Sequence, residues 1–106
     1  MNPLAKVKHT WVKLKFKRND LRIIEHIPAA TFSQILQQYC AQGWELTDAY
    51  RPFDEAQRWQ GKLRKGTSVL TCIWQPEQAG HIYGLSRIIN GMAAQFSLVA
   101  KPAPTY

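Results

Sequence analysis

The chain contains few of the residues that build disulfide frameworks and metal centres. Its 106 residues include two cysteines, Cys40 and Cys72, and three histidines, His9, His26 and His81. Two cysteines are too few for a disulfide framework, and no Cys or His pair has the short spacing that is typical of metal sites. We therefore expect no metal and no cofactor, and a reducing, cytoplasmic environment is the simplest interpretation.

Long apolar runs and catalytic motifs are also missing. No hydrophobic run approaches the roughly 20 residues that span a bilayer, and the stretch MNPLAKVKHTWVKLKFKR lacks the apolar core of a secretory signal. No segment matches a P-loop or a dinucleotide-binding fingerprint. The adjacent pairs Glu25-His26 and Asp54-Glu55 would point apart on a strand, which argues against shared acid–base chemistry. We expect no membrane contact, and enzymatic activity is the least favoured class of function, with no catalytic residue assigned.

Acidic residues are scarce relative to basic ones. Seven Asp and Glu stand against 14 Lys and Arg, and the net charge of +7 favours polyanionic partners such as nucleic acid or an acidic protein surface. Half of the basic residues lie in the first 22 positions: Lys6, Lys8, Lys13, Lys15, Lys17, Arg18 and Arg22. A second cluster comprises Arg58, Lys62, Arg64 and Lys65, and each cluster contains a tryptophan, Trp11 or Trp59.

The N-terminal segment alternates between apolar and polar residues. From His9 to Arg18 this period predicts a half-buried strand. Val12, Leu14 and Phe16 would face the core, and a row formed by Trp11, Lys13, Lys15 and Lys17 would face solvent. Residues 21–27 could form a second strand or an extended connection, and the pattern does not separate the two.

The clearest element is a helix that begins near Thr31. Thr31 and Gln34 form a capping-box pair, and an apolar stripe follows at helical spacing, made of Phe32, Ile35, Leu36, Tyr39 and Cys40. Gly43 predicts the end of this helix, because glycine adopts the left-handed conformation that a helix stop requires. Trp44 and Leu46 would then enter the core from a following strand.

The second half of the chain predicts a loop, a strand, a helix and a last strand. Residues 51–66 are polar and interrupted by Pro52, Gly61 and Gly66, which indicates a long loop. Residues 67–74, TSVLTCIW, have apolar residues at both parities, as in a central strand. Residues 85–96 fit either a hairpin at Asn90-Gly91 or a helix with Ser86 as N-cap, and we favour the helix. A final strand would precede Pro102.

These elements predict a single α+β domain over residues 1–106. The order strand, helix, strand, strand, helix, strand is the ferredoxin-like βαββαβ arrangement, in which two helices cover one face of an antiparallel sheet. The other face of the sheet would be open, with the first and third strands at its centre.

This order of elements resembles that of the RNA-recognition motif family. In that family the third strand begins with a basic residue and glycine and continues with aromatics that stack on bases. The segment KGTSVLTC supplies Lys65 and Gly66 but has Thr67, Val69 and Cys72 in place of the aromatics. The resemblance covers the order of elements and these two residues, and base stacking of the family's kind is not expected.

Two functional hypotheses follow from these patterns. In the first, the chain is a small non-catalytic protein that binds single-stranded DNA or RNA. One basic surface would contact the phosphates, formed by Lys13, Lys15 and Lys17 together with the loop Arg58 to Lys65, which includes Lys62 and Arg64. The bases would stack on Trp11, Trp59 or Trp74. In the second, the open sheet face is the interface of a homodimer or of a complex with a protein partner. A weaker anion site is predicted at Ser86 and Arg87, where Gly80 and Gly84 precede a helix start; an ordinary capped helix is the alternative.

Overall fold

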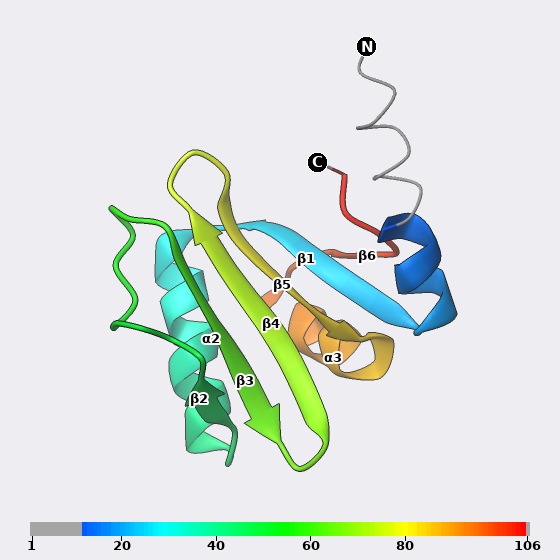
Figure 1. Ribbon diagram of the computed structural model, residues 1–106, viewed down its shortest axis with the longest axis horizontal. Coiled ribbons are helices and arrows are strands. Elements are labelled where there is room, and N and C mark those ends of the chain that lie inside the picture. The colour runs from blue at the N-terminus through cyan, green and yellow to red at the C-terminus, as the bar shows by residue number, and fades with distance from the viewer. Residues whose placement is uncertain (1–11, 106) are drawn as a thin grey trace.

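The structure, a computed structural model, describes residues 12–105. A helical segment over residues 12–18 precedes the labelled elements in Figure 1. These elements are β1 (Leu21–Ile27), α2 (Ala29–Ala41), β2 (Glu45–Thr47), β3 (Trp59–Lys65), β4 (Ser68–Gln75), β5 (Ala79–Leu85), α3 (Ser86–Phe96) and β6 (Ala100–Lys101).

Six antiparallel strands form one sheet, in the order β2-β3-β4-β5-β1-β6. Helices α2 and α3 lie on one face of this sheet (Figure 1). Four strands follow one another between the two helices, so the predicted ferredoxin-like βαββαβ order is wrong. The predicted strand at residues 67–74 is β4, and its position inside the sheet is confirmed.

Strand β3 was not predicted, because its residues lie within the segment 51–66 that was predicted to be a loop. Trp59, Gly61 and Leu63 alternate toward the helix-covered face and are buried there. A Cβ at Gly61 would lie 2.9 Å from the Trp59 ring, so this glycine makes room for the indole. Gly61 therefore does not indicate a loop. It is a glycine within a strand, where the missing side chain allows a bulky neighbour to pack closely.

The predicted first strand is also wrong, since residues 12–18 are helical. Val12 and Phe16 are four residues apart and share one face of the helix, where Phe16 is buried, whereas Leu14 is 56% exposed. Lysine and leucine are good helix formers, and a short alternating pattern cannot outweigh that preference without a neighbouring strand to pair with. The part of the prediction on residues 9–11 lies outside the described residues.

Residues 21–27 form strand β1, which settles the choice between a strand and a connection. The strand pairs with β5 on one side and with β6 on the other. Its register with β5 shifts between Ile24 and Ile27, and His26 has a φ of 56° at this β-bulge.

Helix α2 confirms the predicted helix but begins earlier. Its N-cap is Pro28, and no side chain caps the first turn, so the capping box predicted at Thr31 is wrong. The buried face consists of Phe32, Ile35, Leu36 and Tyr39. The fifth residue of the predicted stripe, Cys40, is exposed instead.

The end of α2 confirms the role predicted for Gly43. Gly43 has a φ of 97°, and its N–H donates to the carbonyl of Cys40 at 3.2 Å. The N–H of Trp44 donates to the carbonyl of Tyr39 at 3.0 Å, and the rings of these two residues lie 5.6 Å apart. This is a Schellman motif with its hydrophobic contact. Trp44 packs against the core as expected, but Leu46 is exposed.

The core between the sheet and the helices is centred on aromatic rings. Phe32 of α2 has ring centroids of Phe53, Trp59 and Trp74 within 5.9 Å. Beneath Phe32, a Cβ at Gly80 would overlap its ring. The predicted placement of Val12, Leu14 and Phe16 in this core is wrong, because Leu14 is exposed and Phe16 packs against Tyr83 on the other face of the sheet.

Helix α3 confirms the choice of a helix over residues 85–96. Gly91 lies within it and has open space where a Cβ would be, consistent with a solvent-facing position. The N-cap is Leu85, not Ser86, and no side chain caps the first turn. The final strand, β6, is only two residues long.

Candidate nucleic-acid interface

The helix over residues 12–18 packs on the sheet face opposite α2 and α3. Phe16 contacts Tyr83 of β5, with ring centroids 5.5 Å apart. Tyr83 is next to Ile82, which belongs to the core beneath the helices, and neighbouring side chains on a strand point to opposite faces. The helix therefore covers the β1 and β5 part of this face and leaves the open part over β2, β3 and β4.

The solvent side of this helix carries a group of cations that have no ion-paired acid among the described residues. Lys13, Lys15, Lys17 and Arg18 are all exposed. No ion pair joins any of them to a described carboxylate. They surround the exposed part of a helix and do not form the straight row that a strand would give. Trp11, the aromatic residue predicted beside them, lies outside the described residues.

The second predicted cluster is partly neutralised by its own neighbours, with two carboxylates beside its four cations. Lys62 and Arg64 lie on β3 and approach the Asp48 carboxylate, with N–O distances of 3.7 and 3.5 Å. Arg58 approaches Glu77 at 3.2 Å. Surface ion pairs contribute little to stability, about 0–1 kcal/mol, but each one places an acid next to a base and lowers the local potential.

Lys65 is held differently from the other cations of this cluster. Its ammonium group donates a hydrogen bond to the carbonyl of Gln42, at 2.9 Å, at the end of α2. A cation at the C-terminal end of a helix interacts favourably with the helix dipole. Lys65 therefore has a structural partner, unlike the lysines of residues 12–18.

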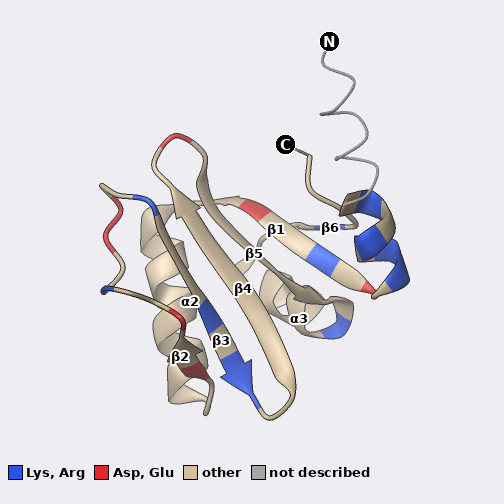
Figure 2. Ribbon diagram, viewed as in Figure 1, with Lys and Arg blue, Asp and Glu red and all other residues tan. Residues whose placement is uncertain are grey.

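Two uncharged strands separate the two basic clusters. Figure 2 shows Lys and Arg on the N-terminal helix and on β3, while β4 and β5 between them have no Lys, Arg, Asp or Glu. The open side of β4 instead presents the half-buried side chains of Val69, Thr71 and Ile73. The described residues thus contain two separate basic clusters with a neutral strip between them, in place of the single basic surface that was predicted.

Two of the three tryptophans proposed as stacking residues, Trp59 and Trp74, lie in the core. Trp59 is 4% exposed, and its indole N–H donates to the carbonyl of Arg51 at 2.7 Å. Trp74 is 5% exposed and donates to the carbonyl of Glu55 at 2.9 Å. Both rings anchor the loop over residues 48–58, and neither has a free face for a base.

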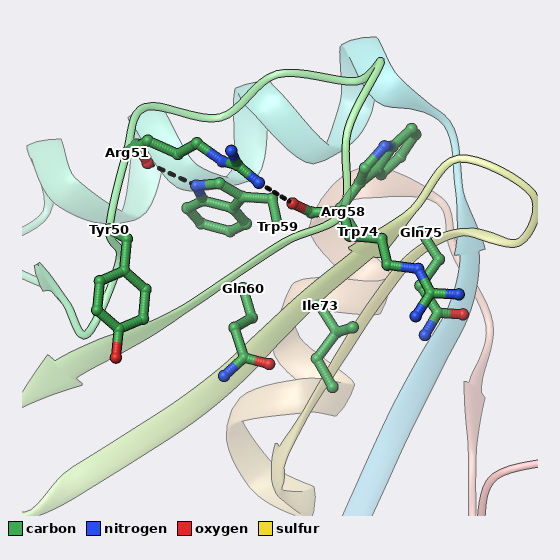
Figure 3. A pocket seen from close by; sticks show the side chains of 8 residues that line it. All are labelled: Tyr50, Arg51, Arg58, Trp59, Gln60, Ile73, Trp74 and Gln75. Atoms are coloured by element: carbon green, nitrogen blue, oxygen red, sulfur yellow. Dashed lines mark hydrogen bonds between the residues drawn. The ribbon is translucent and has the colours of Figure 1, made fainter.

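A groove opens where this loop meets the sheet. It has a volume of about 390 Å³ and is lined by Tyr50, Arg51, Arg58, Trp59, Gln60, Ile73, Trp74 and Gln75. In Figure 3, Tyr50 lies at one end and Arg58 and Gln75 at the other, with Gln60 and Ile73 between them. Tyr50 is 98% exposed. Sequence reasoning missed this residue because it lies in a polar loop without periodic neighbours.

The predicted anion site at Ser86 and Arg87 lacks its expected surroundings. Gly80 and Gly84 lie in β5 and are buried, and a Cβ at Gly84 would reach a Leu70 methyl group. The backbone N–H of Ser86 already donates to the carbonyl of Asp20 at 2.8 Å. The two glycines therefore serve close packing of β5, and Arg87 is an exposed residue of the first turn of α3.

Buried titratable groups lie beside β1 and not in the groove. The Glu25 carboxylate accepts hydrogen bonds from the N–H and hydroxyl of Thr105 and lies 3.3 Å from the Lys101 ammonium. Burial alone raises the pKa of Glu25, but these partners outweigh it, and the net pKa is below the usual value. Burial lowers the pKa of His81, against the attraction of the Glu25 carboxylate.

Cys72 of β4 is a further buried titratable group. Burial raises the pKa of the Cys72 thiol, so it remains protonated and unreactive. No group of three or more His, Cys, Asp or Glu among the described residues could hold a metal ion. Within residues 12–105, no helix is long and apolar enough to cross a membrane.

Comparisons of the chain with models of known families, with curated protein sequences and with solved structures found no match.

Proposed function

We propose that this chain is a non-catalytic protein that binds single-stranded DNA or RNA, with the helix over residues 12–18 as its main phosphate-binding element. The observation that carries the proposal is the set of four exposed cations on this helix, Lys13, Lys15, Lys17 and Arg18, without an ion-paired acid. Unpaired Lys and Arg attract phosphates and release condensed counterions on binding.

The position of the helix supports the proposal further. Phe16 and Tyr83 fix it to the rigid sheet, so the lysines are held beside the open face. Thr71 pairs with Tyr83, and Ile73 of the groove is two residues further along β4. With about 4.8 Å between strands and 3.3 Å per residue, Tyr83 and Ile73 are roughly 8 Å apart. A single strand of a few nucleotides can therefore reach from the helix to the groove.

The cations of β3 contribute less to phosphate binding than those of the helix. Binding through Lys62 and Arg64 requires phosphate to compete with Asp48, which already neutralises part of their charge. This difference provides a matched control, because the two clusters allow variants with the same change in net charge.

The experiment compares two triple variants with the wild type in a binding assay with labelled single-stranded DNA and RNA. The variant Lys13→Gln/Lys15→Gln/Lys17→Gln should lose affinity for every sequence alike. The control variant, in which Lys62, Arg64 and Lys65 are changed to Gln, should lose less, although its net charge falls equally. Equal losses would show a general charge effect and contradict a binding site on the helix.

A protein–protein interface on the open sheet face is the alternative function. The half-buried side chains of Val69, Thr71 and Ile73 form an uncharged strip that a second protein could cover. Light scattering after size exclusion separates the two proposals. A stable dimer whose association is lost in a Thr71→Lys variant would favour the interface.

A further inference from the structure

The groove beside the loop 48–58 has the composition of a site for one unpaired nucleobase. We infer that Tyr50 stacks on this base, that the amides of Gln60 and Gln75 hydrogen-bond to its edge, and that Arg58 binds the adjacent phosphate. This inference rests on the proposed function and assigns to it a preference for single strands over duplexes. It replaces the stacking role that the sequence indicated for Trp59.

Tyr50 is an unusual surface residue. Aromatic side chains normally contribute to stability by burial, yet this residue is 98% exposed. An exposed ring next to cations is the element on which single-stranded nucleic acids stack, without a strong preference for one base.

The backbone beside Tyr50 is held in place. The carbonyl of Arg51 accepts the indole N–H of Trp59, and the Arg51 guanidinium donates to the carbonyl of Arg58 at 2.9 Å. These two bonds join Arg51, the neighbour of Tyr50, to Arg58 and Trp59 at the start of β3 (Figure 3). The backbone next to the Tyr50 ring is therefore held before a base arrives, which reduces the backbone entropy that binding costs.

The polar groups of the groove have unused hydrogen-bonding capacity. The amides of Gln60 and Gln75 make no hydrogen bond to another described residue, and a Gln amide offers both donors and an acceptor to a base edge. Ile73 pairs with Gln60 in the sheet and supplies an apolar floor between them. A volume of about 390 Å³ lies within the range of roughly 300–1,000 Å³ that small-ligand sites occupy.

Arg58 can exchange its present partner for a phosphate. Its side chain is 76% exposed, and its contact with Glu77 is a surface ion pair of the weak kind. A phosphate accepts two hydrogen bonds from a guanidinium in the same planar geometry as a carboxylate.

The test uses the full chain and four probes of equal length: an oligothymidine, an oligoadenosine, an abasic deoxyribose strand and a DNA duplex. Tyr50→Ala should weaken binding of the first two by about 5- to 150-fold, the range that corresponds to the loss of one stacked base. Its binding of the abasic strand and of the duplex should not change. Tyr50→Phe keeps the ring and should bind like the wild type.

The outcomes separate the inference from the proposed function. If Tyr50→Ala binds all four probes like the wild type while the Lys13/Lys15/Lys17 variant binds weakly, the groove is not a base site and the helix remains the phosphate site. If the wild type binds the abasic strand as tightly as oligothymidine, the inference is also overturned. If the wild type binds none of the probes, the proposed function fails and the inference fails with it. Circular dichroism spectra that match the wild type establish that each variant is folded.

Discussion

Replacing Trp59 by alanine should destabilise the fold severely, because this side chain connects β3, the core and the loop 48–58. Its ring centroid lies 5.9 Å from that of Phe32 and 5.7 Å from that of Phe53, and only 4% of the residue is exposed. Truncation of a buried aromatic residue costs about 3–5 kcal/mol. The lost hydrogen bond to Arg51 adds about 1 kcal/mol, since that exposed carbonyl can accept water instead.

The expected total of roughly 4–6 kcal/mol is a large part of the 5–15 kcal/mol that stabilises a typical domain. The assay is urea unfolding followed by far-ultraviolet circular dichroism, which does not depend on the tryptophan removed. Trp59→Phe is the matched variant: it keeps an aromatic ring, loses the indole donor and should cost only about 1–2 kcal/mol. A loss below about 0.5 kcal/mol for Trp59→Ala, the level of surface substitutions, would refute the burial of this ring and the position of β3.

Three further predictions concern the core and the acid dependence of stability. Leu36→Ala should lower the free energy of unfolding by about 2–5 kcal/mol in the same urea assay, because Leu36 lies on the buried face of α2; an unchanged midpoint would contradict the helix-on-sheet packing. Stability should fall as the pH drops below the ordinary His81 pKa of 6.5, since its pKa is lowered in the folded state and the unfolded chain binds the proton more readily; thermal unfolding from pH 8 to pH 5 measures this, and a flat profile would contradict it. A second decline in stability should begin below the ordinary Glu25 pKa of 4.5, because this pKa is also lowered in the folded state. The decline should be absent in Glu25→Gln; its persistence in that variant would assign it to other carboxylates.

The sequence predicted an element correctly where the residues of that element alone determine its structure. Gly43 ends α2 through its left-handed backbone, which follows from chemistry at a single position. The apolar stripe of α3 outweighed the hairpin signal at Asn90-Gly91, because Ile89, Met92 and Ala93 bury one helical face. Neither result depends on how distant segments meet.

The errors arose where tertiary contacts decide the local structure. Gly61 lies in a polar segment and indicated a loop, but its lack of a side chain accommodates the Trp59 ring inside a strand. Residues 12–18 alternate over too short a distance to separate a strand from a helix, and they have no neighbouring strand in the sheet to pair with. With β3 missed, the count of strands and the ferredoxin-like order were wrong.

The candidate site was predictable in composition but not in arrangement. The sequence located both basic clusters, yet the ion pairs of Lys62 and Arg64 with Asp48 form only through the pairing of β2 and β3. Burial of Trp59 and exposure of Tyr50 likewise depend on the course of the loop 48–58. A sequence pattern carries no information about which of two nearby aromatic rings will face solvent.

The central claim is that the helix over residues 12–18 binds phosphates, and the salt dependence of binding measures it most directly. The slope of log K against log salt concentration is determined for a single-stranded oligonucleotide with the wild type and with Lys13→Gln/Lys15→Gln/Lys17→Gln. Each phosphate contact contributes about 0.7 to the slope for single strands, so three lost contacts should reduce it by about 2. An unchanged slope and affinity in the folded triple variant would contradict the account.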